Sequence, residues 1–365
     1  MRNIVFEKNC ILENLKKAKQ QNRKIYIYGC GQMGKIVSRK LNKEKIEYDA
    51  FIINRAYIQK ENIEIDGKPI LVMEDLNTNT SHKEKPIVVI AFRDPDQTIL
   101  FQMSSIAEII NADSLSLWFL EDCEDLWTKN FFEKNIDKLL QTDYMLSDDK
   151  SRESMWAFLQ QKLSGRFSYL ENIWEPDQYF DGEIVDISKV QSFVDCGAYD
   201  GDSFFAFADI YKKRTGKKYS GKAYLLEPDN ENYKKLMDNC NEYQNNIYCQ
   251  VGAWNERNTL VFDSDGTLSS FSSKGSTRIE VDTIDNLTHE NADFIKMDIE
   301  GAELAALQGA QNTIKKCHPI LAVCIYHKSN DLWTIPNYIK SIDDSYHFYI
   351  RAHSNYSMEL VLYAI

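Results

Sequence analysis

The sequence has few of the features that mark secreted, membrane-spanning or zinc-binding proteins. None of its 8 cysteines stands in a C-x-x-C pair, so we expect reduced thiols rather than a disulfide framework or a zinc site. No run approaches the ~20 apolar residues that a transmembrane helix needs. The first residues, Met1 to Glu7, include no apolar segment long enough for a signal peptide. These absences predict a cytoplasmic protein without a membrane span.

An excess of positive charge is also missing. The net charge is −12 over 365 residues, whereas nucleic-acid-binding proteins use Lys and Arg to neutralise phosphates, so we expect no nucleic-acid partner. One basic cluster lies between Lys212 and Lys222; a solvated loop is its simplest interpretation, and a phosphate-binding role is the alternative. The 43% apolar and 27% charged residues are typical of a globular protein. The length suggests about two domains of ~150 residues.

The chain is organised in three parts. Residues 1–120 alternate strand-like runs with helical spacing, which predicts a parallel sheet with helices on its faces. Residues 121–180 are rich in aromatic side chains and have helical patterns, and we interpret them as a linker that covers one edge of the second domain. Residues 181–365 form a second α/β unit. The expected fold class is therefore α/β with two domains.

A glycine turn follows the first predicted strand of the second domain, 192–196. Glycines let the backbone approach a ligand closely, and open α/β sheets bind ligands beyond the carboxyl ends of their strands. The acidic side chains of this turn would repel a pyrophosphate but attract the amino group and sulfonium of S-adenosylmethionine. The predicted cofactor-binding residues here are Asp195, Gly197, Ala198, Tyr199, Asp200, Gly201, Asp202 and Ser203. A side chain at Gly197 is expected to intrude on the cofactor.

The next two predicted strands add to this site. Strand 223–226 ends at Glu227 and Pro228, and an acidic residue at this position can accept hydrogen bonds from both ribose hydroxyls. A helix-capping role for Glu227 is the alternative. Strand 247–251 ends at Gly252 and Ala253, whose small size leaves room for adenine.

The fourth and fifth predicted strands supply candidate catalytic groups. Strand 294–297 ends at Asp298, with Glu300 close behind, and strand 320–325 is followed by His327. A hydroxyl acceptor must lose a proton during attack, so a base at these neighbouring strand ends is expected. Asp298 is also a predicted cofactor contact. The alternatives are carboxylates of a helical first turn, above all for Glu303, and a strand-end histidine bonded to backbone.

A divalent metal bridging these carboxylates is a further option, but the ligand set is incomplete, so no metal is predicted. The last two predicted strands, 346–350 and 360–363, are separated by too few residues for a crossover helix. They should therefore pair antiparallel.

Three ordered motifs of the second domain resemble those of the FkbM family of methyltransferases. They are Phe193–Ser203, Glu227-Pro228-Asp229 and Ile295–Glu303, and the likeness covers roughly residues 175–365. It extends to Ile325–Lys328, Asp331-Leu332-Trp333 and Ile335-Pro336. The resemblance implies a Rossmann-like methyltransferase fold with a mostly parallel seven-stranded sheet. It also implies O-methylation, often of sugar or polyketide hydroxyls.

The first domain has a G-x-G-x-x-G turn between a strand and a helix, which predicts a phosphate at the helix N-terminus. The predicted nucleotide-site residues are Gly29, Gly31, Gln32, Met33 and Gly34. The residue about twenty positions further on, where a dinucleotide-binding protein has Asp or Glu, is Asn54. Residues 22–120 resemble the N-terminal domain of bacterial sugar O- and N-acyltransferases, which implies a Rossmann-like domain that binds a nucleotide or nucleotide-sugar.

The sequence thus predicts an S-adenosylmethionine-dependent O-methyltransferase acting on a hydroxyl of a sugar or glycoconjugate precursor, as in polysaccharide biosynthesis. The partner is a small-molecule acceptor, with a nucleotide-linked glycan precursor as one form, and a homodimer is one expectation. An NAD-dependent oxidoreductase centred on Gly29–Gly34 is the first alternative. A non-catalytic nucleotide-binding assembly protein, or a degenerate scaffolding domain at the N-terminus, also stays open.

Overall fold

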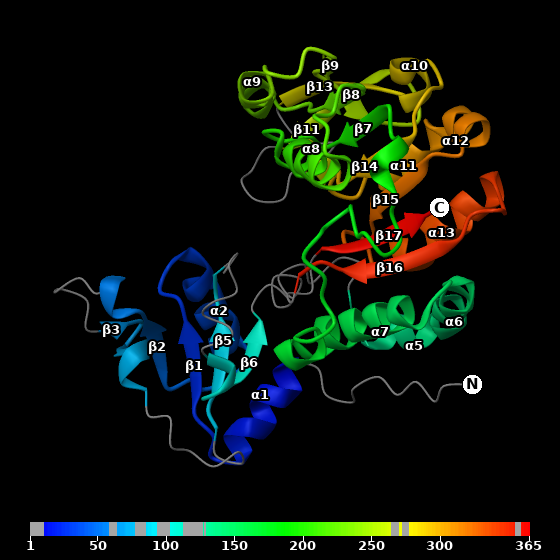
Figure 1. Cartoon of the computed structure of the whole chain (residues 1–365). Helices are drawn as coiled ribbons and strands as arrows, with labels where there is room; N and C mark the ends of the chain where they lie inside the picture. The colour runs from blue at the N-terminus through cyan, green and yellow to red at the C-terminus, as the bar shows by residue number, and fades with distance from the viewer. Residues whose placement is uncertain are drawn as a thin grey trace. The chain divides into compact units, whose positions relative to one another are not determined.

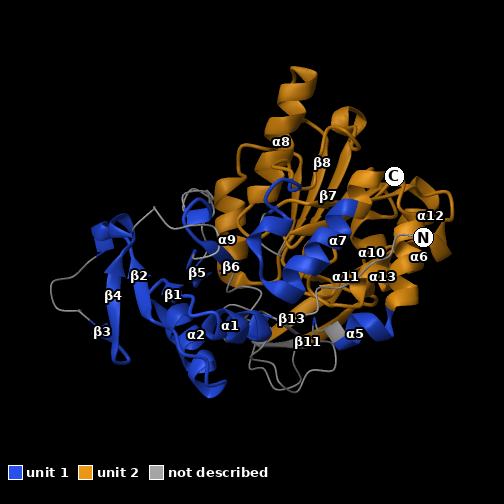
Figure 2. Cartoon of the chain, turned by 90° about the horizontal axis from the view of Figure 1, so that it is seen from below, with its two compact units in different colours: residues 1–135, 153–174, 354–358 blue, residues 136–152, 175–353, 359–365 orange. Residues whose placement is uncertain are grey.

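The computed structural model describes residues 11–57, 64–76, 85–92, 103–111, 127, 129–263, 270–271, 277–354 and 359–365. The chain divides into two compact units, coloured separately in Figure 2: Met1–Asn135, Glu153–Trp174 and Ser354–Met358 form unit 1, and the remainder forms unit 2. The predicted domain boundaries at 120 and 180 stay predictions. In the described part of the chain, no helix is both long enough and apolar enough to cross a membrane.

Unit 1 is built on a six-stranded sheet with the order β3-β4-β2-β1-β5-β6. Only β3 runs antiparallel to its neighbour. Its elements are α1 (Ile11–Gln20), β1 (Ile25–Tyr28), α2 (Gln32–Lys43), β2 (Ala50–Ile53), β3 (Glu64–Ile65), β4 (Lys68–Val72), β5 (Ile87–Ile90) and β6 (Glu108–Asn111). The strands predicted at 25–28, 49–53 and 86–92 are confirmed.

Both faces of this sheet are covered, which explains its continuous apolar strands. Ile27 and Val89 belong to one hydrophobic cluster, together with side chains of α1 and α2. Tyr28 and Val88, one residue away along each strand, belong to a second cluster. Successive side chains of a strand point to opposite faces, so each strand contributes to two cores.

Unit 2 contains a seven-stranded sheet with the order β16-β17-β15-β14-β7-β8-β9, labelled in Figure 1. The strands are β7 (Ser192–Cys196), β8 (Lys222–Leu226), β9 (Asn246–Cys249), β14 (Phe294–Met297), β15 (Ile320–Cys324), β16 (Phe348–Ala352) and β17 (Leu360–Ala364). Only β17 runs antiparallel to its neighbours, which confirms the predicted closing pair. Strand order reverses between β7 and β14, and such a switch point is where open α/β sheets bind ligands.

The remaining elements of unit 2 connect or flank this sheet. They are α6 (Ile136–Met145), α8 (Asp202–Thr215), α9 (Asn230–Asn239), α10 (Ile284–Thr288), α11 (Glu303–Gln308), α12 (Gln311–Cys317) and α13 (Asp331–Ile342). A small second sheet has the order β10-β13-β11-β12, from β10 (Gly252–Ala253), β11 (Asn258–Asp263), β12 (Ser270–Phe271) and β13 (Thr277–Asp282). Helix α5 (Lys129–Lys134) belongs to unit 1, and α7 (Asp149–Ser164) contributes to both units.

Aromatic packing holds α8 against the sheet. The rings of Phe193 on β7 and Phe207 on α8 stack with centroids 4.3 Å apart, and Phe294 on β14 packs beside both. All three side chains are fully buried. This core fixes where α8 begins, and therefore the path of the turn that precedes it.

The basic cluster after residue 211 is partly helical rather than a solvated loop. Lys212, Lys213 and Arg214 occupy the last turn of α8, where cations complement the helix dipole. The Arg214 guanidinium donates hydrogen bonds to the carbonyls of Val185 and Phe180. Arg214 therefore anchors the segment that leads into β7.

Candidate cofactor and catalytic site

The glycine turn lies at the switch point between β7 and β14. The Asp298 amide donates to the Cys196 carbonyl over 3.1 Å, which continues the pairing of the two strands. Gly197 has φ +79°, and a Cβ there would lie 2.1 Å from the Asp298 carbonyl oxygen. The structure therefore corrects the expected reason for this glycine: a side chain would collide with the neighbouring strand end before it reached a ligand.

Gly201 closes the turn and begins α8. Its φ is +97°, and a Cβ would lie 2.5 Å from the Cys240 sulfur. Asp202 Oδ1 accepts from the Ser203 amide at 2.6 Å, and the Asp200 carbonyl accepts from Asn239 at 2.9 Å. The turn is thus fixed by backbone and side-chain hydrogen bonds where it enters the helix.

Asp195 is not the free carboxylate that the sequence suggested. It is fully buried, and its Oδ1 forms a 3.0 Å ion pair with Lys296, which is 2% exposed. The two residues are register partners on β7 and β14, and the Lys296 ammonium also donates to the Gly197 carbonyl at 2.8 Å. Burial raises the pKa of Asp195 to about 6 in spite of Lys296. The ion pair between Asp195 and Lys296 therefore stabilises the glycine turn.

Glu227 joins the second strand to the glycine turn. Its Oε2 accepts from the Tyr199 amide at 2.9 Å and its Oε1 from the Asp229 amide at 2.8 Å. The carboxylate is 6% exposed, and burial raises its pKa to about 7. The residue that caps α9 is Asp229, so the capping alternative for Glu227 is wrong.

The other predicted cofactor residues lie around these two. The Ala198 amide donates to the Leu226 carbonyl at 3.0 Å. Tyr199 is half exposed with φ +47°, a conformation that is uncommon outside glycine. Gly252 and Ala253 are buried in β10, and a Cβ on Gly252 would lie 4.0 Å from the Pro228 Cβ. The predicted third strand thus ends at Cys249, and Gly252 and Ala253 belong to β10 of the second sheet, which lies next to Pro228.

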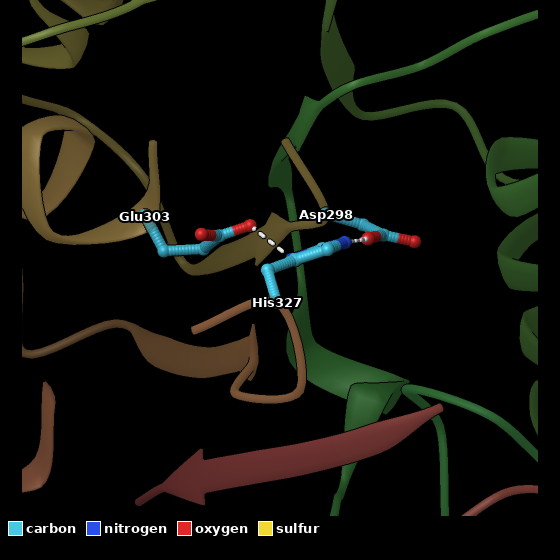
Figure 3. A group of neighbouring side chains, drawn as sticks. All are labelled: Asp298, Glu303 and His327. Atoms are coloured by element: carbon cyan, nitrogen blue, oxygen red, sulfur yellow. Dashed lines mark ion pairs between the residues drawn. The ribbon is translucent and has the colours of Figure 1, made fainter. Parts of the chain in front are cut away.

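His327 lies among three carboxylates at the ends of β14 and β15. Its Nε2 is 3.4 Å from Asp298 Oδ1 and 3.4 Å from Glu300 Oε2, and its Nδ1 is 2.9 Å from Glu303 Oε1. Figure 3 shows the imidazole between Glu303 and Asp298. The structure thus brings together the three predicted catalytic residues and adds Glu303.

Two tyrosine hydroxyls fix the Asp298 carboxylate. Tyr179 donates to Oδ2 at 2.9 Å and Tyr326 donates to Oδ1 at 3.1 Å. Burial would raise the pKa of Asp298, but the charges of Lys296 and His327 and these hydrogen bonds hold it below its usual range. Asp298 is therefore an ionised carboxylate at the edge of the glycine turn.

The pKa of His327 differs from that of an ordinary imidazole, which titrates near 6.5. Burial alone would lower its pKa, but Glu303, Asp298 and Glu300 together raise it to about 9. In the free protein the imidazole is therefore protonated at neutral pH. The sequence could not predict this, because it does not show how many carboxylates surround the ring.

One donor atom from each of Asp298, Glu303 and His327 lies within 4.8 Å of the others, close enough for a shared metal ion. The two ring nitrogens, however, face different carboxylates. Such an arrangement is typical of a chain of ion pairs rather than of donors converging on one point. The absence of a metal stays a prediction.

The sequence analysis missed four residues of this region. Lys296 is a charged residue inside an apolar strand, which is itself a signal, because buried charges are almost always paired. Tyr179 lies far from the other site residues in sequence. Tyr326 and Glu303 stand next to or near predicted residues, but only the packing shows which way their side chains point.

The glycine turn of unit 1 has the expected placement. Gly31 is the N-cap residue of α2 and makes no side-chain cap hydrogen bond. A Cβ on Gly34 would lie 2.0 Å from the Gly29 carbonyl oxygen, whereas one on Gly31 would meet nothing within 4 Å among the described residues. The Asn54 Oδ1 accepts from the Tyr28 hydroxyl at 2.7 Å. Gln32 and Met33 are the first residues of α2.

Comparisons with known proteins agree with the geometry of unit 2. Residues 195–353 match the model of the methyltransferase FkbM domain. No curated protein matches the chain. The methyltransferase FkbM of Methylobacillus flagellatus KT is similar in structure, with a TM-score of 0.70 and 22% identity over 96% of this chain and 93% of that one. This likeness shows the fold.

Two archaeal fibrillarins are similar over smaller parts of the chain. The Aeropyrum pernix protein, solved with S-adenosyl-L-methionine, has 10% identity and a TM-score of 0.34 over 52% of this chain and 73% of its own. The Methanococcus jannaschii protein has 16% identity and a TM-score of 0.32 over 50% and 68%. The family match and the site at the switch point lead to one conclusion: residues 195–353 match the methyltransferase FkbM domain, and the chain is an S-adenosylmethionine-dependent methyltransferase.

Proposed function

We propose that the enzyme methylates a hydroxyl oxygen of a sugar or glycoconjugate precursor, as in polysaccharide biosynthesis. The observation that supports this best is the group formed by His327, Asp298 and Glu300, with both carboxylates 3.4 Å from the imidazole Nε2. A hydroxyl must give up its proton as its oxygen attacks a methyl group, and a group of this kind can receive that proton.

The proposed cofactor site fits the chemistry of the methyl donor. Glu227 accepts two backbone hydrogen bonds, and an ionised carboxylate has about four lone-pair sites, so acceptor capacity remains for two ribose hydroxyls. The turn from Gly197 to Ser203 would border the amino-acid part, and Pro228, Gly252 and Ala253 would border adenine. When bound, S-adenosylmethionine supplies an electrophilic methyl group on a cationic sulfur.

The acidic residues of the proposed site have separate roles. Asp195 is paired with Lys296 and holds the turn, whereas Asp298 presents a carboxylate fixed by Tyr179 and Tyr326. We assign proton acceptance to His327, Asp298 and Glu300 as a unit, because interacting groups titrate together and not one by one. The same unit also positions the acceptor oxygen for attack on the methyl group, and this positioning contributes to the rate.

For unit 1 we propose a nucleotide or nucleotide-sugar site at Gly29, Gly31, Gln32, Met33 and Gly34. Among the described residues, nothing fills the space beside Gly31 and Gly31 makes no side-chain cap hydrogen bond at the start of α2, and both features support a phosphate there. Asn54 is engaged by Tyr28 and lacks the charge that a dinucleotide ribose requires. Calorimetry with a UDP-sugar, NAD and S-adenosylmethionine, on wild type and Gly31→Val, tests this assignment.

The acceptor is identified by incubating the enzyme and S-adenosylmethionine with an extract of glycan precursors and searching by mass spectrometry for products heavier by one CH₂ unit. The expected product forms with the wild-type enzyme and is strongly reduced with His327→Ala. Products methylated only on nitrogen or carbon would overturn the proposal. A cytoplasmic location and a homodimer stay predictions, which microscopy and sedimentation analysis test.

A further inference from the structure

Glu303 has an environment that its position at the start of a helix does not explain. It is the first residue of α11, where a carboxylate complements the helix dipole while exposed to solvent. Here the side chain is fully buried. Burial of an ionised carboxylate is costly unless it is paired and hydrogen-bonded, so its partners indicate its role.

The partners of Glu303 come from two strand ends. Its Oε1 accepts from the Ile299 amide at 3.0 Å and from the Gly301 amide at 3.4 Å, both in the loop after β14. The same oxygen lies 2.9 Å from Nδ1 of His327, which follows β15. One carboxylate oxygen therefore connects the loop that carries Asp298 and Glu300 to the imidazole that faces them.

We infer that Glu303 is the positioning residue of the catalytic group: it holds Nδ1 of His327 so that Nε2 faces Asp298 and Glu300. A histidine ring has two nitrogens, and a partner on one of them fixes both the orientation of the ring and the proton carried on that side. The importance of this role for catalysis rests on the proposed function. The contact between Glu303 and His327 is a feature of the structure and does not depend on the proposed function.

Other charged groups also lie around the imidazole and Glu303. Asp298 and Glu300 face Nε2, and Asp331 on α13 is buried near Glu303, with a pKa raised to about 7 by burial and by the Glu303 charge. Lys328 donates to the Gly301 carbonyl, and Lys296 is paired with Asp195. Among the described residues that face the ring, Glu303 makes the shortest ion pair with it.

The test is a pH titration of the His327 imidazole by nuclear magnetic resonance. The chain has 6 histidines, so the spectrum of His327→Ala assigns the signal. In the wild type we expect the ring to stay protonated up to about pH 9. In Glu303→Gln, which keeps the shape but removes the charge, the pKa of His327 should fall by about 1–3, the usual effect of an opposite charge.

Glu290→Gln is the matched control, because Glu290 pairs with Lys316 at the surface and its loss should leave the titration unchanged. Glu303→Asp keeps the negative charge, so the pKa of His327 should stay partly elevated in this variant. A wild-type ring that titrates near 6.5, or an unchanged pKa in folded Glu303→Gln, would overturn the inference. The first of these outcomes is read from the wild-type protein and needs no variant of Glu303, so a folding defect in Glu303→Gln cannot obscure the answer.

Kinetics then separate positioning from the proposed function. With the acceptor identified, Glu303→Gln should lower kcat and leave the dissociation constant of S-adenosylhomocysteine, whose sulfur is neutral, unchanged. Normal kcat in Glu303→Gln would contradict the catalytic part of the inference. Normal kcat in His327→Ala, combined with the expected titration shift, would instead refute the proposed function and leave Glu303 as the residue that orients His327.

Discussion

Binding of S-adenosylmethionine should release a proton from this protein, and binding of S-adenosylhomocysteine should release fewer. The sulfur of the first compound carries a positive charge and that of the second is neutral. Because the methyl group must face the proposed proton acceptors, we place the sulfur of the bound cofactor near Asp298, whose carboxylate also attracts the protonated His327. Two cations beside the same carboxylate repel each other, so the cofactor should favour the neutral imidazole.

The size of the effect follows from the pKa of about 9 for His327 in the free protein. A nearby like charge lowers the pKa of an imidazole by about 1–3, which gives a bound-state pKa between about 6 and 8. At about pH 7.5 the ring would change from roughly 97% protonated to between roughly 3% and 76%. The extra release is therefore about 0.2–0.9 proton per site.

Calorimetry in several buffers of different ionisation enthalpy measures this number directly. Glu227 has a pKa of about 7 and also releases protons when ribose hydroxyls bind, but both compounds carry the ribose, so this contribution cancels in their difference. In His327→Ala the difference should disappear. Equal proton release by the two compounds with the wild-type protein would refute the placement of the sulfonium beside this cluster.

Four further variants have expected outcomes. Glu227→Ala should weaken S-adenosylmethionine binding roughly tenfold to a hundredfold in calorimetry, because a charge-assisted hydrogen bond contributes about 1.5–3 kcal/mol; an unchanged affinity in folded protein would place the ribose elsewhere. Gly197→Ala should lower the melting temperature far more than Gly216→Ala, since both have positive φ but only the former meets a backbone atom; similar losses would contradict this. Lys296→Met should cost about 3–5 kcal/mol in urea unfolding, as it leaves a buried carboxylate unpaired. His327→Ala should still bind the cofactor but lose about 10²–10⁴ in turnover, while wild-type kcat/KM for S-adenosylmethionine should rise with pH up to about 9, the pKa of His327 in the free protein; near-normal turnover would remove His327 from the mechanism.

The sequence by itself determined the α/β class, the seven strands of the main sheet of the second domain and the strand ends at which we propose that the cofactor binds, whereas it did not predict the second sheet formed by β11, β12 and β13. These features depend on local patterns. The glycine turn after β7, the acidic residue after β8 and the apolar runs of β14 and β15 each lie within a few residues of chain. Since the carboxyl ends of parallel strands meet at one edge of a sheet, these patterns also predicted that Glu227, Asp298 and His327 would share that edge.

Only the tertiary structure decided the charges and partners within the site. Lys296 neutralises Asp195 because the register of β7 against β14 places them side by side. Gly197 is required by the carbonyl of Asp298, which comes from a strand about a hundred residues later. Glu303 turns inward to His327 instead of outward to solvent, and the pKa of a buried imidazole depends on every charge packed around it. Charge states and contacts of this kind depend on residues that are close in space, and local sequence patterns do not show which residues these are.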